Sequence, residues 1–416
     1  MGSTALSAGG GGDDLHERPD LLEALAHLTD EALGGDDVAV VDPDRGAERL
    51  VPQQLDAGVV DAPAPRGRLD LVAVDGPALL AEPAGGEEVA GRRIELVVKD
   101  DGAVADATKR LAQELVVHDK VEALAGFGLT PLALAAAPIS ARAKVPQIVM
   151  VAATSVVTEK SPYIVRTSYT TPQVTSKIAD WVLEQGDRSA VTLVMDYGPG
   201  VDAEATFKTK FEAAGGKVLE SLRVPLQNPD FSAFLQKVAD LKPQTLFVFV
   251  PSGVGGPLLK QYVERGLDKS GIRLIADGGV TDDETLPMMG PPAEGILTGF
   301  HYSAAHDSDL NRKFVADYAA KAGTRPAFMG VAAWDGMHLL HEALKKTGGM
   351  SDGDSLIAAM KGMAWESPRG PISIDPETRD IVQNVYIRKV ERRDGELWNV
   401  EFQTYEAVRD PGKSAA

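Results

Sequence analysis

Short apolar runs alternate with longer amphipathic segments along residues 93–346, and this alternation limits the chain to a small set of folds. Strands are predicted at 94–101, 121–127, 147–153, 190–196, 217–224, 245–250, 273–276 and 295–300. Helices are predicted between and after them, at 103–117, 132–143, 173–185, 203–214, 231–240, 256–265, 310–322 and 332–346. Nearly continuous apolar strands joined by helices are typical of parallel sheets covered on both faces. The body is larger than one core usually organises, so we expect an α/β protein with two lobes, each a parallel sheet flanked by helices.

The C-terminal segment follows a different pattern. Short alternating runs at 370–375, 385–390 and 398–402 are separated by turns such as Arg393-Asp-Gly. Such spacing predicts an antiparallel meander appended to the second lobe.

Residues 1–93 differ in composition from the rest of the chain. They contain no Phe, Tyr, Trp, Lys, Ile or Asn, and they carry 19 acidic residues against 7 arginines. A segment with these residues has little from which to build a dense core. Within this atypical acidic head, residues 20–33 have helical spacing and residues 69–74 alternate like a short strand. Two explanations stay open: a weakly ordered, disordered extension, or codons read in the wrong frame or from the wrong start.

Several function classes are excluded by charge and by missing motifs. The net charge of −19 argues against nucleic acid or an anionic membrane as a partner. The sequence lacks GxxxxGK[ST], a complete GxGxxG and GxSxG, so we expect no enzyme and no cofactor. His301 and His306, the pair His338 and His341, and the acidic stretch 277–284 lack the full spacing of a metal site, so no metal is expected either.

Polar and aromatic residues follow several predicted strands at their carboxyl ends, where small ligands bind in parallel α/β sheets. They are Thr130, Thr154, Tyr197, Ser252 and Asp277. A cleft lined this way offers hydroxyls and backbone amides for a carboxylate, an aromatic lid, and one acid for a cation. Taken singly, Thr130 and Thr154 are also explained as helix caps, and Tyr197 as a packed surface tyrosine. Together they favour a binding site in a protein that is not an enzyme.

Six segments give the chain a family resemblance. They are AGGEEVAGRRIELVVKDD at 84–101, AGFGLTPLALAAAP at 125–138, VAATS at 151–155, SPYIVRTSYTTPQ at 161–173, DYGPG at 196–200 and GPISIDPETRDIVQNVYIRKV at 370–390. The chain resembles the periplasmic binding proteins of type I fold, in the leucine/isoleucine/valine-binding branch that serves ABC importers. The resemblance covers about residues 84–405.

The resemblance implies a two-lobe clamp with three crossovers. Lobe one would comprise residues 94–167 and 299–367, and lobe two residues 168–298 and 368–416. In relatives that bind amino acids, the residues matching Thr130, Ala152, Ala153 and Thr154 hold the α-carboxylate, and the one matching Tyr197 closes over the ligand. Ser252 and Trp334 would lie near wall positions, and Asp277 near the acid that grips the α-ammonium.

The chain departs from the family pattern at three places. The acid for the ammonium would lie within 277–279, where the sequence has Asp277-Gly-Gly and not an acid at the later position. Amides, aromatic acids and other carboxylates are therefore open as ligands beside branched-chain amino acids. The family's first strand and its Ser-Gly turn should precede Ala84, and nothing in the head matches them. The first residues also lack the charged start and apolar core of a secretory signal peptide.

These observations predict the substrate-binding component of an ABC importer, which binds a small carboxylate-bearing solute between its lobes. By resemblance it would be a periplasmic monomer whose partners are that solute and a membrane permease, and not nucleic acid. The alternative is a cytoplasmic ligand-sensing regulator on the same fold, which the leaderless start would suit.

Overall fold

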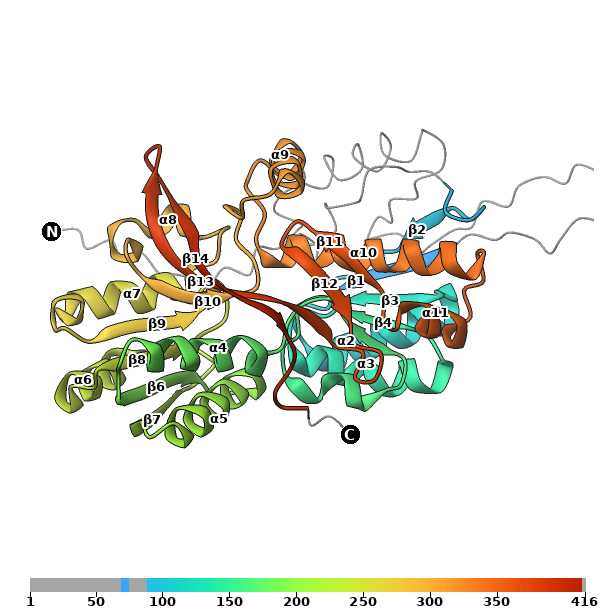
Figure 1. Ribbon diagram of the computed structural model, residues 1–416. Helices are drawn as coiled ribbons and strands as arrows, with labels where there is room; N and C mark the ends of the chain where they lie inside the picture. The colour runs from blue at the N-terminus through green and yellow to red at the C-terminus, as the bar shows by residue number, and fades with distance from the viewer. Residues whose placement is uncertain (1–68, 75–87, 414–416) are drawn as a thin grey trace, which may run out of the picture. The chain divides into compact units, whose positions relative to one another are not determined.

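The computed structural model describes residues 88–413 together with the backbone of residues 69–74. The first sheet is parallel, with strand order β2-β1-β3-β4-β5 (Figure 1). Its strands are β1 (Leu69–Val74), β2 (Ile94–Leu96), β3 (Ala123–Gly126), β4 (Gln147–Val149) and β5 (Ile164–Arg166). The helices α2 (Ala105–Glu114) and α3 (Thr130–Ala143) connect consecutive strands of this sheet. Its topology is that of a doubly wound α/β sheet.

Strand β1 changes the expectation for the head. The alternating pattern at 69–74 predicts a short strand, but these residues do not match the sequence of the family's first strand. In the structure this segment pairs with β2 on one side and with β3 on the other. The first sheet therefore has a central strand drawn from the acidic head. The predicted helix at 20–33 lies outside the described residues, as does the rest of the head up to residue 87 apart from β1.

The second sheet has nine strands, in the order β11-β12-β13-β10-β9-β8-β6-β7, with β14 paired to β13. Its parallel strands are β6 (Ser189–Met195), β7 (Lys217–Val224), β8 (Thr245–Phe249), β9 (Arg273–Asp277) and β10 (Leu297–Phe300). The helices of the remaining chain are α4 (Thr171–Glu184), α5 (Gly198–Ala213), α6 (Ser232–Leu241), α7 (Gly255–Glu264), α8 (Leu286–Met289), α9 (Asp309–Ala322), α10 (Phe328–Thr347) and α11 (Gly353–Met360).

The parallel strands of the second sheet are covered on both faces, as their apolar sequences predict. Successive side chains of a strand point to opposite faces. In β8, Phe247 joins the apolar cluster that includes α4 and α5, whereas Leu246 and Val248 join the cluster that includes α6 and α7. Phe247 stacks on Phe207 of α5 with ring centroids 4.6 Å apart. The apolar run of β8 is therefore explained by two separate cores, one on each side of the sheet.

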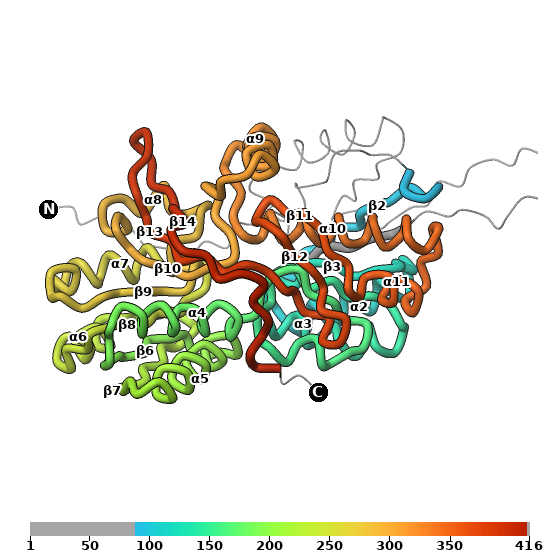
Figure 2. The backbone as a smooth tube through the Cα atoms, in the orientation of Figure 1, coloured from blue at the N-terminus to red at the C-terminus, as the bar shows by residue number. Residues whose placement is uncertain are grey.

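The C-terminal strands pair in antiparallel fashion, as predicted, but two of them are much longer than the sequence suggests. Strands β13 (Ile381–Arg393) and β14 (Glu396–Val408) have 13 residues each, and they form the red hairpin of Figure 2. Gln383 and Arg388 are buried within β13, so they interrupt the apolar pattern without ending the strand. Strand β13 also pairs with β10 and with β12 (Gly370–Ile374), and β11 (Ala364–Ser367) pairs with β12.

Candidate functional site

Thr130 and Thr154 form a hydroxyl pair after two neighbouring strands of the first sheet. Thr130 begins α3 after β3, and Thr154 follows β4. Both side chains are buried, and their Oγ1 atoms lie 2.8 Å apart in a hydrogen bond. Neither hydroxyl caps a helix, so the alternative explanation of these residues as caps is wrong. Only one hydroxyl can donate within the pair, which leaves the other O–H group for a ligand.

Arg166 fixes the loop that carries Thr154. The guanidinium of Arg166 is fully buried and donates to the backbone oxygens of Ala152 at 2.8 Å and Thr154 at 2.9 Å. Its Nε donates to Asp380 at 2.7 Å, and Lys413 also pairs with Asp380. The oxygen of Ala153 accepts a hydrogen bond from the backbone N–H of Thr171, at 2.9 Å. The predicted residues Ala152 and Ala153 are thus buried backbone supports of the hydroxyl pair.

The start of α5 closes on the hydroxyl pair. Tyr197 precedes α5, and a Cβ atom on Gly198 would lie 2.7 Å from Oγ1 of Thr154 and 3.7 Å from Cγ2 of Thr130. Only glycine allows the helix to come this near. The backbone N–H of Ser155 also donates to Asp202 of α5, at 2.9 Å. The structure therefore brings Tyr197 to the same place as Thr130 and Thr154.

Asp277 lies at the end of β9 and is 1% exposed. Its Oδ1 accepts a hydrogen bond from the N–H of Gly279 at 3.0 Å, but its Oδ2 has no partner among the described residues. Burial raises the pKa of Asp277 to about 7, although the Gly279 N–H and the charge of Arg388 act in the opposite direction. Burial, and after it the charge of Asp277, raises the pKa of the Tyr197 hydroxyl. Near neutral pH this carboxyl can accept or donate a hydrogen bond.

Ser252 lies beside Asp277, because a Cβ atom on Gly279 would be 3.4 Å from Oδ1 of Asp277 and 3.5 Å from the backbone nitrogen of Ser252. Ser252 follows β8, and its hydroxyl lies close enough to Asp282 to lower the pKa of that carboxyl, which burial raises to about 6. Trp334 stacks on His338, with ring centroids 5.3 Å apart, and His338 in turn faces Trp365 at 5.3 Å. Trp334 also packs against the apolar cluster that includes Tyr169 and Phe328, and Tyr197 packs against the same cluster.

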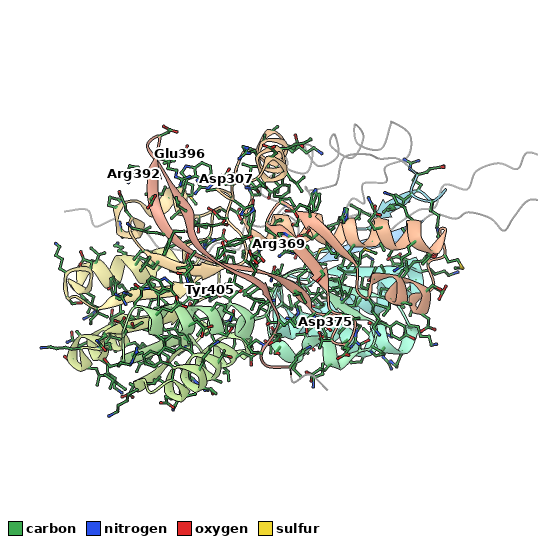
Figure 3. All side chains as sticks on the ribbon, in the orientation of Figure 1. Asp307, Arg369, Asp375, Arg392, Glu396 and Tyr405 are labelled. Atoms are coloured by element: carbon green, nitrogen blue, oxygen red, sulfur yellow. The ribbon has the colours of Figure 1, made fainter. Side chains whose placement is uncertain are left out.

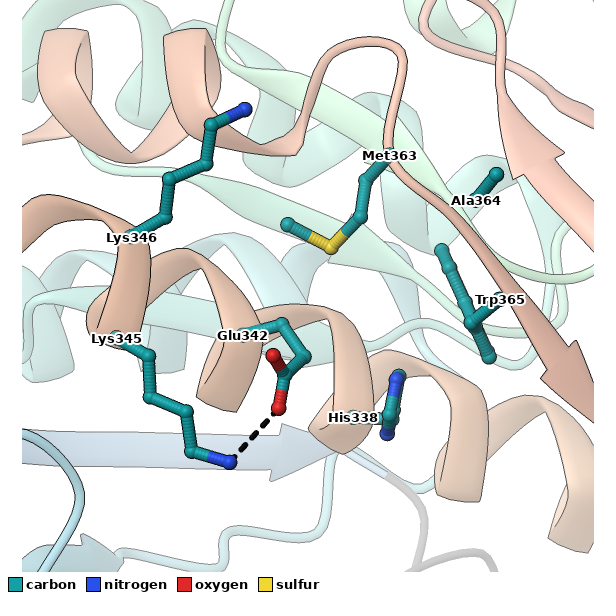
Figure 4. Close-up of a pocket in the computed structure, with 7 residues that line it drawn as sticks. All are labelled: His338, Glu342, Lys345, Lys346, Met363, Ala364 and Trp365. Carbon is teal, nitrogen blue, oxygen red and sulfur yellow. Dashed lines mark hydrogen bonds and ion pairs between the residues drawn. The ribbon is translucent and has the colours of Figure 1, made fainter.

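His338 and Trp365 belong to a separate pocket between α10 and the start of β11 (Figure 4). Its wall is completed by Glu342, Lys345, Lys346, Met363 and Ala364, and Lys345 donates to Glu342 at 2.8 Å. Trp334 is thereby linked to this pocket, and its place in the wall of the ligand site stays a prediction.

Four aromatic residues near the site are absent from the sequence prediction. Tyr169 lies in the crossover between β5 and α4, and its ring stacks on His301 with centroids 4.7 Å apart. The rings of Phe300 and Phe328 pack edge-to-face with Tyr169, with centroid distances of 5.1 and 6.1 Å. Phe300 follows Gly299, which is paired with Asp277 of β9, so this aromatic group adjoins the Asp277 end of the site. Burial, and after it the charges of Asp277 and Tyr197, raises the pKa of the Tyr169 hydroxyl well above its usual value. Tyr169 could have been proposed from the sequence, because it falls within the segment 161–173 that contributes to the family resemblance.

No helix in the described part of the chain is both long and apolar enough to cross a membrane. Residues 69–74 and 88–413 also contain no group of three or more His, Cys, Asp or Glu side chains arranged to hold a metal ion.

Comparison with known proteins agrees with this geometry. The family model described as "Periplasmic binding protein" matches residues 73–396. A curated relative, Leu/Ile/Val-binding protein homolog 6 of Brucella abortus (strain 2308), is 47% identical over 336 residues, which cover 79% of this chain and 86% of the relative.

Two solved structures are similar in both sequence and fold. The solute binding protein of an ABC transporter from Rhodopseudomonas palustris BisB5, in complex with 3,4-dihydroxy benzoic acid, is 57% identical with a TM-score of 0.80, covering 84% of this chain and 99% of that one. The solute binding protein from Rhodopseudomonas palustris HaA2, in complex with p-hydroxybenzoic acid, is 42% identical with a TM-score of 0.78, covering 83% and 98%. These transport proteins support the predicted solute-binding function over a ligand-sensing regulator. The chain belongs to the periplasmic binding protein family and is a solute-binding protein of the ABC-transporter type.

Proposed function

We propose that this protein binds a small aromatic carboxylate of the hydroxybenzoate class. The observation that carries the proposal is the hydroxyl pair of Thr130 and Thr154 under the start of α5. Hydroxyl and backbone donors at the beginning of two helices suit a carboxylate. Tyr169, Tyr197 and Phe328 supply flat walls, and flat aromatic walls suit a ring-shaped ligand. Two similar solute-binding proteins hold hydroxylated benzoic acids.

Branched-chain amino acids are the second candidate. They share the carboxylate, and the relative from Brucella abortus is named for leucine, isoleucine and valine. Their ammonium group would need Asp277 in its charged form. Burial raises the pKa of Asp277 to about 7, and its Oδ2 lacks a partner within the described residues. A neutral hydroxyl group can hydrogen-bond such a carboxyl in either protonation state, which favours a phenolic ligand.

Isothermal titration calorimetry on the full chain separates the two candidates. The panel contains 4-hydroxybenzoate, 3,4-dihydroxybenzoate, benzoate, benzyl alcohol and leucine. We expect the benzoates to bind and leucine to bind at least about tenfold more weakly, the discrimination given by one unmatched polar group. Benzyl alcohol lacks the carboxylate and should not bind. Tighter binding of leucine than of every benzoate would contradict the proposal.

The physiological setting is also part of the proposal. We infer that the protein works as a monomer in the periplasm, delivers its ligand to an ABC permease and leaves the ligand chemically unchanged. Size-exclusion chromatography with light scattering tests the monomer. Mass spectrometry of the ligand after prolonged incubation tests the last point, and any conversion product would contradict it. Loss of benzoate uptake after deletion of the gene, restored by the gene in trans, tests the delivery.

A further inference from the structure

His301 follows β10 directly, at the carboxyl end of the strand. Strand β10 runs parallel to β9, and Gly299 of β10 is paired with Asp277 of β9. His301 therefore lies at the same edge of the sheet as Asp277. In parallel α/β sheets this edge is where ligands bind.

His301 is fully buried, and neither of its ring nitrogens has a hydrogen-bond partner among the described residues. A neutral imidazole carries one donor and one acceptor, and leaving both unpaired in the interior is unfavourable. His306 offers a contrast five residues later, because its Nδ1 lies 2.8 Å from Oε2 of Glu401. The lack of hydrogen-bond partners is therefore specific to the position of His301 and is not shared by the neighbouring histidine.

The surroundings of His301 hold the ring in place and keep it uncharged. The ring of His301 stacks on that of Tyr169, with centroids 4.7 Å apart and an angle of 22° between the planes. The centroid of the Phe300 ring lies 4.3 Å from that of His301. Burial, and after it the charges of Arg369 and Arg388, lowers the pKa of His301 well below its usual value. Arg369 (labelled in Figure 3) is itself buried and paired with Asp335 at 2.7 Å. A fixed neutral ring presents a directional donor and acceptor to whatever reaches it.

Tyr169 links His301 to the ligand site. One face of Tyr169 stacks on His301. The backbone oxygen of Tyr169 accepts a hydrogen bond at 3.4 Å from the guanidinium of Arg166, which also holds the carbonyl oxygens of Ala152 and Thr154. His301 is thus one aromatic ring away from a residue that shares Arg166 with the Thr154 loop. Thr130 and Thr154 come from the first sheet, whereas Asp277 and His301 come from adjacent strand ends of the second.

We propose that His301 is a specificity-determining residue that hydrogen-bonds a ring hydroxyl of the ligand, at the part of the ligand away from the Thr130–Thr154 pair. This inference rests on the proposed binding of hydroxybenzoates. A phenolic hydroxyl both donates and accepts, so it can pair with an imidazole nitrogen and with the free oxygen of Asp277. Benzoate has no such group and leaves His301 unpaired in the complex.

The test is calorimetric titration of 4-hydroxybenzoate and of benzoate into the wild type and into the His301→Phe variant. Phenylalanine keeps a ring to stack on Tyr169 but removes both nitrogens. We expect His301→Phe to weaken 4-hydroxybenzoate by about tenfold or more and benzoate by less than about threefold. The matched control is His306→Gln, which we expect to leave the ratio of the two affinities unchanged, since Glu401 already pairs with His306.

An equal loss for both ligands in His301→Phe would overturn the assignment and leave His301 a packing residue. A wild type that binds neither benzoate would refute the proposed function itself, and with it this inference. If His301→Phe fails to fold by circular dichroism, ¹⁵N-histidine NMR of the wild type decides, with the His301 signals assigned from His301→Gln. A His301 nitrogen shift produced by 4-hydroxybenzoate and not by benzoate supports the assignment. The same shift with both ligands contradicts it.

Discussion

The two ends of the candidate site are built on opposite principles. At the Thr130–Thr154 end, the hydroxyls bond to each other and Arg166 satisfies the carbonyls behind them. At the Asp277–His301 end, the carboxyl Oδ2 and both imidazole nitrogens are buried without partners in the described part of the chain. A paired end is rigid before the ligand arrives and suits a group common to all ligands. An unpaired end gains most from a ligand that supplies the missing partners, so it is suited to discrimination.

The largest expected effect comes from removing the support of the paired end. Arg166→Met should lower the free energy of unfolding by about 3–5 kcal/mol, the range for breaking a buried ion pair. The lower part of that range is expected, because Lys413 still pairs with Asp380. Urea unfolding measures the loss. Arg223→Met is the control, because Arg223 is 43% exposed in its ion pair with Glu204 and should cost only about 0–1 kcal/mol. Equal losses in the two variants would show that Arg166 does not fix the Thr154 loop.

The second prediction concerns the paired hydroxyls themselves. Thr154→Val keeps the shape of the side chain and removes the hydroxyl, so carboxylate binding should weaken by about 1.5–3 kcal/mol, the range for a hydrogen bond to a charged group. Thr154→Ser retains the hydroxyl and should recover most of the affinity. Calorimetry should use benzoate, because benzoate has a carboxylate for the paired end but no ring hydroxyl for the unpaired end. Wild-type affinity in Thr154→Val would remove Thr154 from the site.

A third prediction tests how closely α5 must approach the paired end. A Cβ atom on Gly198 would lie 2.7 Å from Oγ1 of Thr154. Gly198→Ala should therefore weaken ligand binding by about 1–3 kcal/mol, the cost of overpacking a filled site. Gly256→Ala at the start of α7 is the matched control, since the nearest atom to a Cβ there is 3.9 Å away. Tight binding by Gly198→Ala would mean that closure does not need this contact.

The smallest effect belongs to the unpaired end and depends on pH. Burial raises the pKa of Asp277 from 3.8 to about 7, so the native state binds a proton that the unfolded chain has already lost between about pH 4 and 7. Stability should therefore fall as pH rises through this window, by at most about 1.4 kcal/mol per pH unit from this group. Burial also raises the pKa of Asp282, to about 6, so the range from pH 6 to 7 isolates Asp277 best.

The matched variant is Asp277→Asn, which keeps the shape and cannot ionise. Urea unfolding of wild type and variant at pH 6 and pH 7 should show a steeper loss of stability in the wild type. Parallel behaviour of the two proteins would mean that Asp277 does not titrate in this range.

The sequence located both threonines of the paired end but only Asp277 of the unpaired end, and the reason is chain locality. Thr130, Thr154 and Asp277 stand one to three residues after the predicted strands 121–127, 147–153 and 273–276, so the strand pattern alone locates them. Tyr169, His301 and Phe328 come from the crossovers and the start of α10, and they meet only in the folded chain. In the sequence His301 only lacks the spacing of a metal site, and no local pattern reveals that both of its ring nitrogens are without partners among the described residues.

The length of β13 was missed for a related reason. Its buried Gln383 and Arg388 interrupt the apolar pattern, but other parts of the chain satisfy them. Arg388 donates to Thr298 and to the oxygens of Tyr302 and Gly278, and Gln383 to Ser168 and Gln173. Polar residues paired with distant partners in this way cannot be told from loop residues by periodicity.

The central position of β1 has a practical consequence for anyone who shortens this protein. A chain begun at Arg93 would look reasonable from composition, because it discards the part without aromatic residues. It would also remove the strand between β2 and β3, and so expose the backbone hydrogen-bonding edge of β3. Bare strand edges recruit strands from other molecules. We expect such a truncated protein to accumulate in inclusion bodies, whereas a chain begun before Leu69 keeps the edge of β3 covered.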